Sequence, residues 1–181
     1  MADINQVWEA QGLNPLNMRV GIHSDAVLVG NMGSMERMSY TVMGDAVNLA
    51  SRVEALTRVY GVDILLGEST AAAVGDRLAL VEVDRVRVKG KQVAVTLFTP
   101  LSAAIAGQAQ FADEMRLWQL ALTSYRLQHW DRAQTTLQGL QSDFGDSPLA
   151  GLYRQFLDRT TDFRCTPPAP DWDGAHTFDN K

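Results

Sequence analysis

Apolar side chains change their spacing along the chain and divide it into three regions. Up to about residue 100, short apolar runs alternate with turn residues, a pattern typical of strands and short helices. From Ala103 onward, apolar and aromatic residues recur every three or four positions, which indicates helices. Residues 166–181 are rich in proline and are expected to be extended. We therefore predict a mixed α+β domain over residues 1–100, a helical tail over 101–165 and an extended C-terminus over 166–181.

The first region is predicted to contain strands separated by turns. It opens with the pattern of a helix that stops at Gly12, and Pro100 is expected to end the domain. The second strand is expected to return alongside the first after a turn at residues 23–25, and residues 32–34 are expected to form a loop. The last two strands are joined by a tight turn at residues 89–92. The six expected strands are at residues 18–22, 26–29, 38–42, 62–66, 78–88 and 93–98.

Two further helices are predicted within this region. Asp45 stands at an N-cap position, and the apolar residues after it keep helical spacing until Gly61. Ser69 is expected to cap a shorter, alanine-rich helix that ends near Gly75.

The tail is predicted to form three helices with apolar faces. The positions of Trp118, Trp130, Ala133 and Leu137 give the tail a weak resemblance to a tetratricopeptide-type helical hairpin, although one such repeat is too short to be stable alone. A helical cap that packs on the first domain explains the same pattern equally well. The residues that mark the three faces are Phe111, Met115, Trp118, Leu122 and Tyr125; Trp130, Ala133, Leu137 and Leu140; and Pro148, Leu152 and Phe156.

Composition narrows the classes of protein to consider. The formal net charge of −5 argues against a nucleic-acid partner, which requires a basic surface. A single cysteine, Cys165, excludes an internal disulfide and suits a reducing compartment. The chain shows neither a signal peptide nor an apolar run of the ~20 residues that a membrane helix needs. We expect a soluble, cytoplasmic protein, or the cytoplasmic end of a membrane-anchored parent.

The first candidate for chemistry is a pair of polar residues on the predicted helix after Asp45. Asn48 and Arg52 are one helical turn apart and share a face of that helix. An amide and a guanidinium placed in this way can hold a ribose-linked oxygen and a phosphate, and the arginine can meet charge that develops during phosphoryl transfer. From the spacing alone, an ordinary exposed arginine with an asparagine in a polar patch is the favoured interpretation.

A second candidate is Lys89 at the tip of the last predicted hairpin. A lysine there can reach the phosphates of a triphosphate as a mobile point charge. Most lysines in such turns are simply solvated. We do not assign Asp45 as a metal ligand, because an N-capping role explains its position.

Four ordered blocks over residues 5 to 100 closely resemble the C-terminal half of the class III adenylyl and guanylyl cyclase catalytic domain. This resemblance implies a ferredoxin-like α+β domain that forms head-to-tail dimers with the active site at the interface. It favours the functional interpretation of Asn48 and Arg52. The blocks are residues 19–23 (RVGIH), 29–34 (VGNMGS), 40–54 (YTVMGDAVNLASRVE) and 86–91 (VRVKGK).

The resemblance also implies a role for each candidate residue. Asn48 aligns with the asparagine that positions the ribose, and Arg52 with the arginine that stabilises the pentavalent phosphorus. Lys89 aligns with a lysine that contacts the substrate phosphates. Thr41 falls at the position that reads the purine base, and its hydroxyl is compatible with adenine. The implied reaction is attack of the ribose 3′ oxygen of ATP on the α-phosphate, which releases pyrophosphate and gives 3′,5′-cyclic AMP for second-messenger signalling.

The resemblance further implies two divalent ions, Mg or Mn. The family's two metal-binding aspartates and its base-reading lysine belong to the N-terminal half, which has no match here, so no metal ligand is assigned. The expected partners are ATP and a second cyclase domain, as a homodimer or a heterodimer. We expect the isolated chain to be inactive. The alternatives are a catalytically inactive partner that binds nucleotide or dimerises, and an interaction module that acts through its tail.

Overall fold

A five-stranded sheet forms the centre of the computed structural model, which describes residues 2–34, 37–88 and 93–178. Its strand order is β1 (Val20–Ile22), β4 (Ile64–Gly67), β6 (Val95–Leu101), β5 (Ala79–Val88) and β7 (His176–Phe178). The β4–β6 and β6–β5 pairs are antiparallel, whereas β1 with β4 and β5 with β7 are parallel. Together with the helices, this sheet confirms the expected α+β class.

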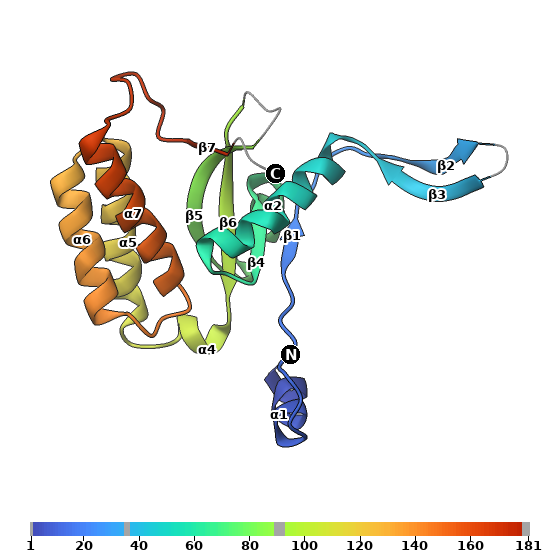
Figure 1. The fold of residues 1–181 in the computed structure, drawn as a ribbon, viewed down its shortest axis with the longest axis horizontal. Helices are drawn as coiled ribbons and strands as arrows, with labels where there is room; N and C mark the ends of the chain where they lie inside the picture. The colour runs from blue at the N-terminus through green and yellow to red at the C-terminus, as the bar shows by residue number, and fades with distance from the viewer. Residues whose placement is uncertain (1, 35–36, 89–92, 179–181) are drawn as a thin grey trace.

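A separate two-stranded ribbon corrects the expected strand pairing. β2 (Leu28–Ser34) pairs with β3 (Arg37–Met43) and projects away from the body of the molecule (Figure 1). The expectation that the second strand returns alongside the first was wrong, because β1 pairs in parallel with β4 instead. Residues 32–34 are strand rather than loop, because they continue the antiparallel register, with Met32 opposite Ser39.

Three shorter elements agree with the expected order but differ at their ends. The chain opens with α1 (Ala2–Ala10), and α3 (Glu68–Val74) runs into a 3₁₀ turn (Gly75–Arg77). β6 continues through Pro100 to Leu101, beyond the expected end of the domain. Pro100 is tolerated there because β4 pairs with β6 only at Leu97 and Phe98. The tight turn expected at residues 89–92 lies outside the described residues.

Both predicted N-caps were wrong by one or two positions. Helix α2 (Asp45–Tyr60) is preceded by Gly44 as its N-cap, with a φ of 152° that residues with a side chain rarely adopt. Asp45 is instead the first helical residue, where a carboxylate is favoured by the helix dipole. Gly67 caps α3, and the hydroxyl of Ser69 donates to the carbonyl oxygen of Ser24 at 2.6 Å.

The tail contains the three predicted helices, α5 (Phe111–Arg126), α6 (Trp130–Asp143) and α7 (Ala150–Cys165), after a short α4 (Ala103–Ala106). They stand side by side next to β5 (Figure 1). Most of the apolar positions that predicted these helices are buried between them. The buried apolar residues of the tail are Trp118, Ala121, Leu122, Tyr125, Ala133, Leu137, Leu140, Leu149, Ala150, Leu152, Tyr153 and Phe156.

The tail and the sheet share one continuous apolar core. The indole nitrogen of Trp118 donates to the carbonyl oxygen of Glu82 on β5 at 2.7 Å. Arg126 forms an ion pair with the Glu82 carboxylate at 2.5 Å. The tail is therefore packed against the sheet, as a helical cap would be, and its likeness to a tetratricopeptide hairpin stays a prediction. Among the described residues, no helix combines the length and apolarity needed to cross a bilayer.

The described part of the C-terminal segment pairs with the sheet. β7 lies parallel to β5, with His176 opposite Val86. Upstream of β7, the ring of Trp172 packs against those of Tyr125, Trp130 and Phe163, with ring centroids 5.4–6.2 Å apart. The segment is thus fixed by backbone pairing and by an aromatic cluster.

The protonation state of His176 makes the pairing of β7 with the sheet sensitive to low pH. Burial, together with repulsion from Arg159, lowers the pKa of His176 to about 4. Between this value and the ordinary value of ~6.5 the unfolded chain binds the extra proton and the folded chain does not, so stability is lost as the pH falls.

We predict that the free energy of unfolding of the wild-type protein decreases as the pH is lowered from about 6.5 to about 4. His176→Gln should flatten this slope, whereas His129→Gln, at an exposed position, should leave it unchanged. Denaturant unfolding at a series of pH values measures both. An equal slope in the wild type and in His176→Gln would contradict the assignment.

Candidate active site

Helix α2 presents Asn48 and Arg52 at the edge between its buried and exposed faces. Its buried residues, among them Leu49 and Val53, pack toward the sheet. Asn48 is exposed and Arg52 is half-buried. The boundary position expected from the apolar neighbours is therefore confirmed.

Within the described residues, neither side chain is held by an ion pair or a side-chain hydrogen bond. The ion pairs of the described part involve other arginines, including Arg126 and Arg159. Because its charge is not neutralised in this way, the Arg52 guanidinium is available to an anionic ligand. Asn48 likewise keeps both its amide donor and its acceptor available.

The other two candidates lie on different elements. Thr41 is exposed on β3, opposite Gly30 of β2, four residues before α2 begins. No hydrogen bond joins its side chain to Asn48 or Arg52 within the described part of the chain. Lys89 follows Val88, the last residue of β5, and lies outside the described residues.

Gly21 sets the distance between β1 and α2 next to Arg52. A Cβ atom at Gly21 would lie 2.3 Å from the backbone nitrogen of Glu54 and 2.5 Å from the carbonyl oxygen of Ala50. These atoms lie on either side of Arg52 along the helix, so the backbones of β1 and α2 are in direct contact there. Sequence reasoning missed this contact, although a glycine within a strand is a known sign of close backbone approach.

A buried polar cluster holds the other end of α2. Tyr60, its last residue, donates from its hydroxyl to Oδ2 of Asp84 on β5 at 2.6 Å. Arg159 of α7 forms an ion pair with the same oxygen at 2.5 Å. Burial, with the negative charge of Asp84 next, raises the pKa of Tyr60 well above its usual value, so the phenol stays protonated and donates.

This cluster was also missed, but the sequence contains signals for it. Apolar residues of β5 alternate through Val81 and Val83 and then shift phase to Val86 and Val88, which places Asp84 on the inner face. The register shift between Glu82 and Asp84 is the corresponding bulge. Arg159 likewise falls on the apolar face of α7, three residues after Phe156.

Metal ligands are not gathered in the described residues. No group of three or more histidine, cysteine, aspartate or glutamate side chains lies close enough together there to hold an ion. The described residues therefore do not fit a divalent metal site, and no chemical step of theirs is assigned to one.

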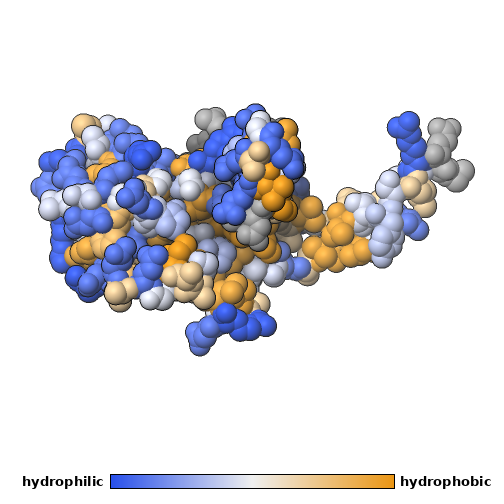
Figure 2. All heavy atoms as spheres, turned by 90° about the horizontal axis from the view of Figure 1, so that it is seen from below, coloured by the Kyte–Doolittle hydropathy of each residue, from blue (hydrophilic) through white to orange (hydrophobic). Residues whose placement is uncertain are grey.

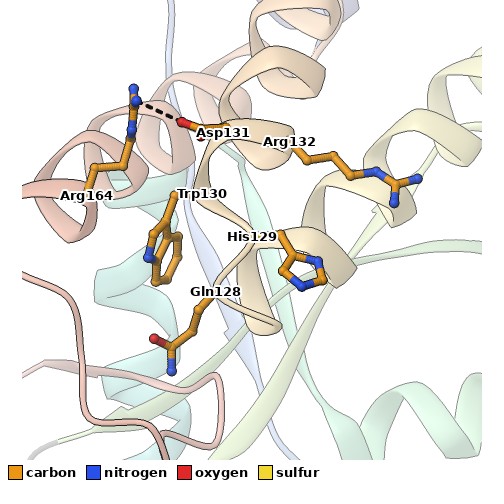
Figure 3. A pocket seen from close by; sticks show the side chains of 6 residues that line it. All are labelled: Gln128, His129, Trp130, Asp131, Arg132 and Arg164. Atoms are coloured by element: carbon orange, nitrogen blue, oxygen red, sulfur yellow. Dashed lines mark ion pairs between the residues drawn. The ribbon is translucent and has the colours of Figure 1, made fainter.

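Two surface hollows lie in the tail, away from Asn48 and Arg52. One is lined by the start of α6 and the end of α7, where Asp131 and Arg164 form an ion pair at 2.7 Å (Figure 3). The other lies between the start of α5 and the loop that follows α6. Neither hollow includes a residue that sequence analysis assigned to chemistry.

The ribbon carries large apolar side chains that nothing in the described chain covers. Leu28, Met38 and Tyr40 are 72%, 61% and 75% exposed. Apolar residues also gather where the ribbon joins the body (Figure 2). Val47, beside Asn48 on α2, is exposed as well. Exposed apolar surface of this kind is typical of an interface with another protein chain.

Comparison with known proteins identifies the family. A model of the adenylate and guanylate cyclase catalytic domain matches residues 1–100. The chain belongs to this family. The cyclase residues thus include β1, the ribbon, α2 and β5, and the resemblance noted from the sequence is confirmed at this level.

Individual cyclases agree with the family match. Adenylate cyclase 1 of Rhizobium meliloti (strain 1021) is 34% identical over 94 residues, 52% of this chain and 14% of that protein. Adenylate cyclase of Anabaena cylindrica is 40% identical over 90 residues, 48% of this chain and 18% of that protein. The adenylyl cyclase CyaB from P. aeruginosa has a similar fold, with a TM-score of 0.50 and 32% identity over 57% of this chain and 52% of that one. The chain thus spans less than a fifth of these curated relatives and about half of the solved structure.

We predict that Gly21→Ala displaces α2 from β1 and destabilises this cyclase domain by about 1–3 kcal/mol or more, because the added methyl group meets backbone atoms that cannot move aside. Gly139→Ala is the matched control, since nothing lies within 4 Å of its added Cβ. Within helix α6 the control should be neutral or stabilising by up to about 1 kcal/mol. Thermal unfolding of both variants measures the difference, and equal midpoints would contradict the close contact.

Proposed function

We propose that this chain is part of a longer, dimeric adenylyl cyclase, to whose active site it supplies Asn48 and Arg52. This full-length protein would convert ATP to 3′,5′-cyclic AMP and pyrophosphate for second-messenger signalling. The observation that carries the proposal is an amide and a guanidinium one turn apart on the accessible side of α2, both without a protein partner in the described chain. Membership of the cyclase family supports the reaction class. The names of the relatives support adenine as the base.

For this reaction the protein must stabilise the charge on the phosphorus centre and align the ribose 3′ oxygen with it. The ribose 3′ oxygen loses its proton and bonds to the α-phosphorus, while the bond from that phosphorus to the bridging oxygen breaks and pyrophosphate leaves. Arg52 would donate to the oxygens of the pentavalent phosphorus, where negative charge increases. Asn48 would hold the ribose so that the 3′ oxygen faces the phosphorus.

Base and phosphate recognition are assigned to Thr41 and Lys89. The exposed hydroxyl of Thr41 can both donate to and accept from the adenine edge, which is compatible with ATP. Lys89, directly after β5, would contact the substrate phosphates as a point charge. Both assignments rest on the position of these residues in the cyclase motifs.

A second cyclase domain is proposed as the partner, in a homodimer or a heterodimer. The uncovered apolar residues of the ribbon and of the start of α2 support this proposal, because Val47 directly precedes Asn48 and the ribbon strand β3 ends two residues before α2 begins. In a head-to-tail dimer, a partner on this surface would complete the site around α2. The residues that bind the two Mg or Mn ions would then lie outside the described residues, on cyclase elements of the partner.

The alternative is an inactive, nucleotide-binding or dimerising partner, with which the described residues are equally compatible. The described residues offer no cluster of metal ligands, so this chain by itself would not activate the 3′ oxygen. The two hypotheses share the same interface and differ in whether the assembled protein turns over ATP. They are separated by the experiments below.

We predict that Arg52→Ala or Asn48→Ala in the full-length protein lowers kcat about 100–1,000-fold, because each removes a donor that acts on the transition state or aligns the ribose. Arg58→Ala is the matched control, since Arg58 is an exposed arginine in the last turn of the same helix. Cyclic AMP production under saturating ATP measures the effect. Full activity in Arg52→Ala, with an unchanged unfolding midpoint, would refute the role.

We also predict that the isolated 181-residue chain produces no cyclic AMP from Mn-ATP. Mixing it with the full-length Arg52→Ala variant should restore activity, because the chain then provides Arg52 to sites whose metal ligands come from the variant. Turnover by the chain alone would overturn its expected inactivity. A mixture that forms dimers and stays inactive would overturn the shared site.

A further inference from the structure

Arg159 is a buried charge at the junction of the helical tail with the cyclase domain. It is 5% exposed, and its partner Asp84 is 1% exposed. One guanidinium nitrogen, Nη1, donates to Oδ2 of Asp84 at 2.5 Å, and the other, Nη2, donates to the hydroxyl of Tyr60 at 3.2 Å. A single side chain from α7 therefore bonds to both α2 and β5.

Three aromatic rings enclose the same guanidinium. Its central carbon lies 5.5 Å from the ring centroid of Tyr60, 5.2 Å from that of Phe156 and 5.5 Å from that of Phe178. These distances are within the range of cation–π attraction. Since Phe178 belongs to β7, the C-terminal strand also meets the cluster. Four elements, α2, β5, α7 and β7, thus converge on one residue.

The position of Tyr60 connects this junction to the candidate site. Tyr60 and Arg52 lie on one continuous helix, roughly 12 Å apart along its axis at ~1.5 Å per residue. The backbone contact at Gly21 holds this helix beside Arg52, and the cluster holds its end. Asp84 lies on the strand whose last residue, Val88, precedes Lys89.

We infer that Arg159 is a positioning residue for the cyclase reaction, fixing α2 relative to β5 so that Asn48 and Arg52 are held in place for the substrate. The inference rests on the proposed function of α2. It makes the helical tail part of the catalytic apparatus rather than an independent module. Arginine is suited to this role because its planar fork bonds to two acceptors at once and stacks on rings, which lysine does not do.

The test is Arg159→Lys in the full-length protein, which keeps the charge and removes the fork. Arg164→Lys is the matched control, because Arg164 lies on the same helix and pairs only with residues of the tail, Asp131 and Gln134, in the described chain. Tyr60→Phe is a second variant, which keeps the ring and the Asp84–Arg159 ion pair and removes one hydroxyl. Each variant is measured for kcat, for KM toward ATP, for its unfolding midpoint and for amide hydrogen exchange in residues 45–60.

Arg159→Lys is expected to raise exchange in residues 45–60 and to lower kcat about 10-fold with KM changed less than about twofold, as for the loss of alignment in the transition state. Tyr60→Phe should shift both quantities in the same direction by a smaller factor, and Arg164→Lys should match the wild type. Unchanged exchange or unchanged kcat in a folded Arg159→Lys protein overturns the inference, as does an equal decrease in Arg164→Lys. If the wild-type protein shows no cyclase turnover, the proposed function fails, and the exchange of residues 45–60 still decides whether Arg159 holds α2.

Discussion

The placement of α2 depends on a contact in which no side chain intervenes. At Gly21 the backbone of β1 lies directly against the helix backbone between Ala50 and Glu54. Any larger residue at this point would place its Cβ atom against the backbone of the helix. Since Arg52 lies within this span, the same contact determines how far its side chain stands from the sheet. At the other end the buried Tyr60–Asp84–Arg159 cluster holds the helix, so the candidate site is carried by an element fixed at two points.

Local spacing was enough to predict most elements, because their signals are contained in a few neighbouring residues. The helices of the tail follow from apolar residues such as Trp118 and Leu122, which recur one turn apart. The two N-caps were predicted at the wrong residues because Gly44 competes with Asp45 for this position, and Gly67 with Ser69. Only the backbone angles decide between them. The pairing of β1 with β4 depends on contacts far apart in sequence, and spacing contains no information about it.

The candidate site shows the same division between local and distant information. Asn48 and Arg52 were found because they are neighbours on one helix and belong to a motif of the cyclase family. The residues that hold this helix come from β1, β5 and α7, and nothing in the motif includes the tail. Arg159 and Asp84 do have local signals, a charged residue on an apolar face, but such a signal does not name its partner. Assigning the pair requires the tertiary structure.

Strand β7 also has a consequence for how this sheet meets its surroundings. The outer edge of β5 would otherwise present unpaired backbone donors and acceptors, which recruit strands from other molecules. β7 occupies part of that edge, and the ion pair of Arg87 with Asp173 holds the segment just before it. Loss of this segment would therefore expose the backbone groups of residues 86–88 to pairing with strands of other molecules, independently of any effect on catalysis.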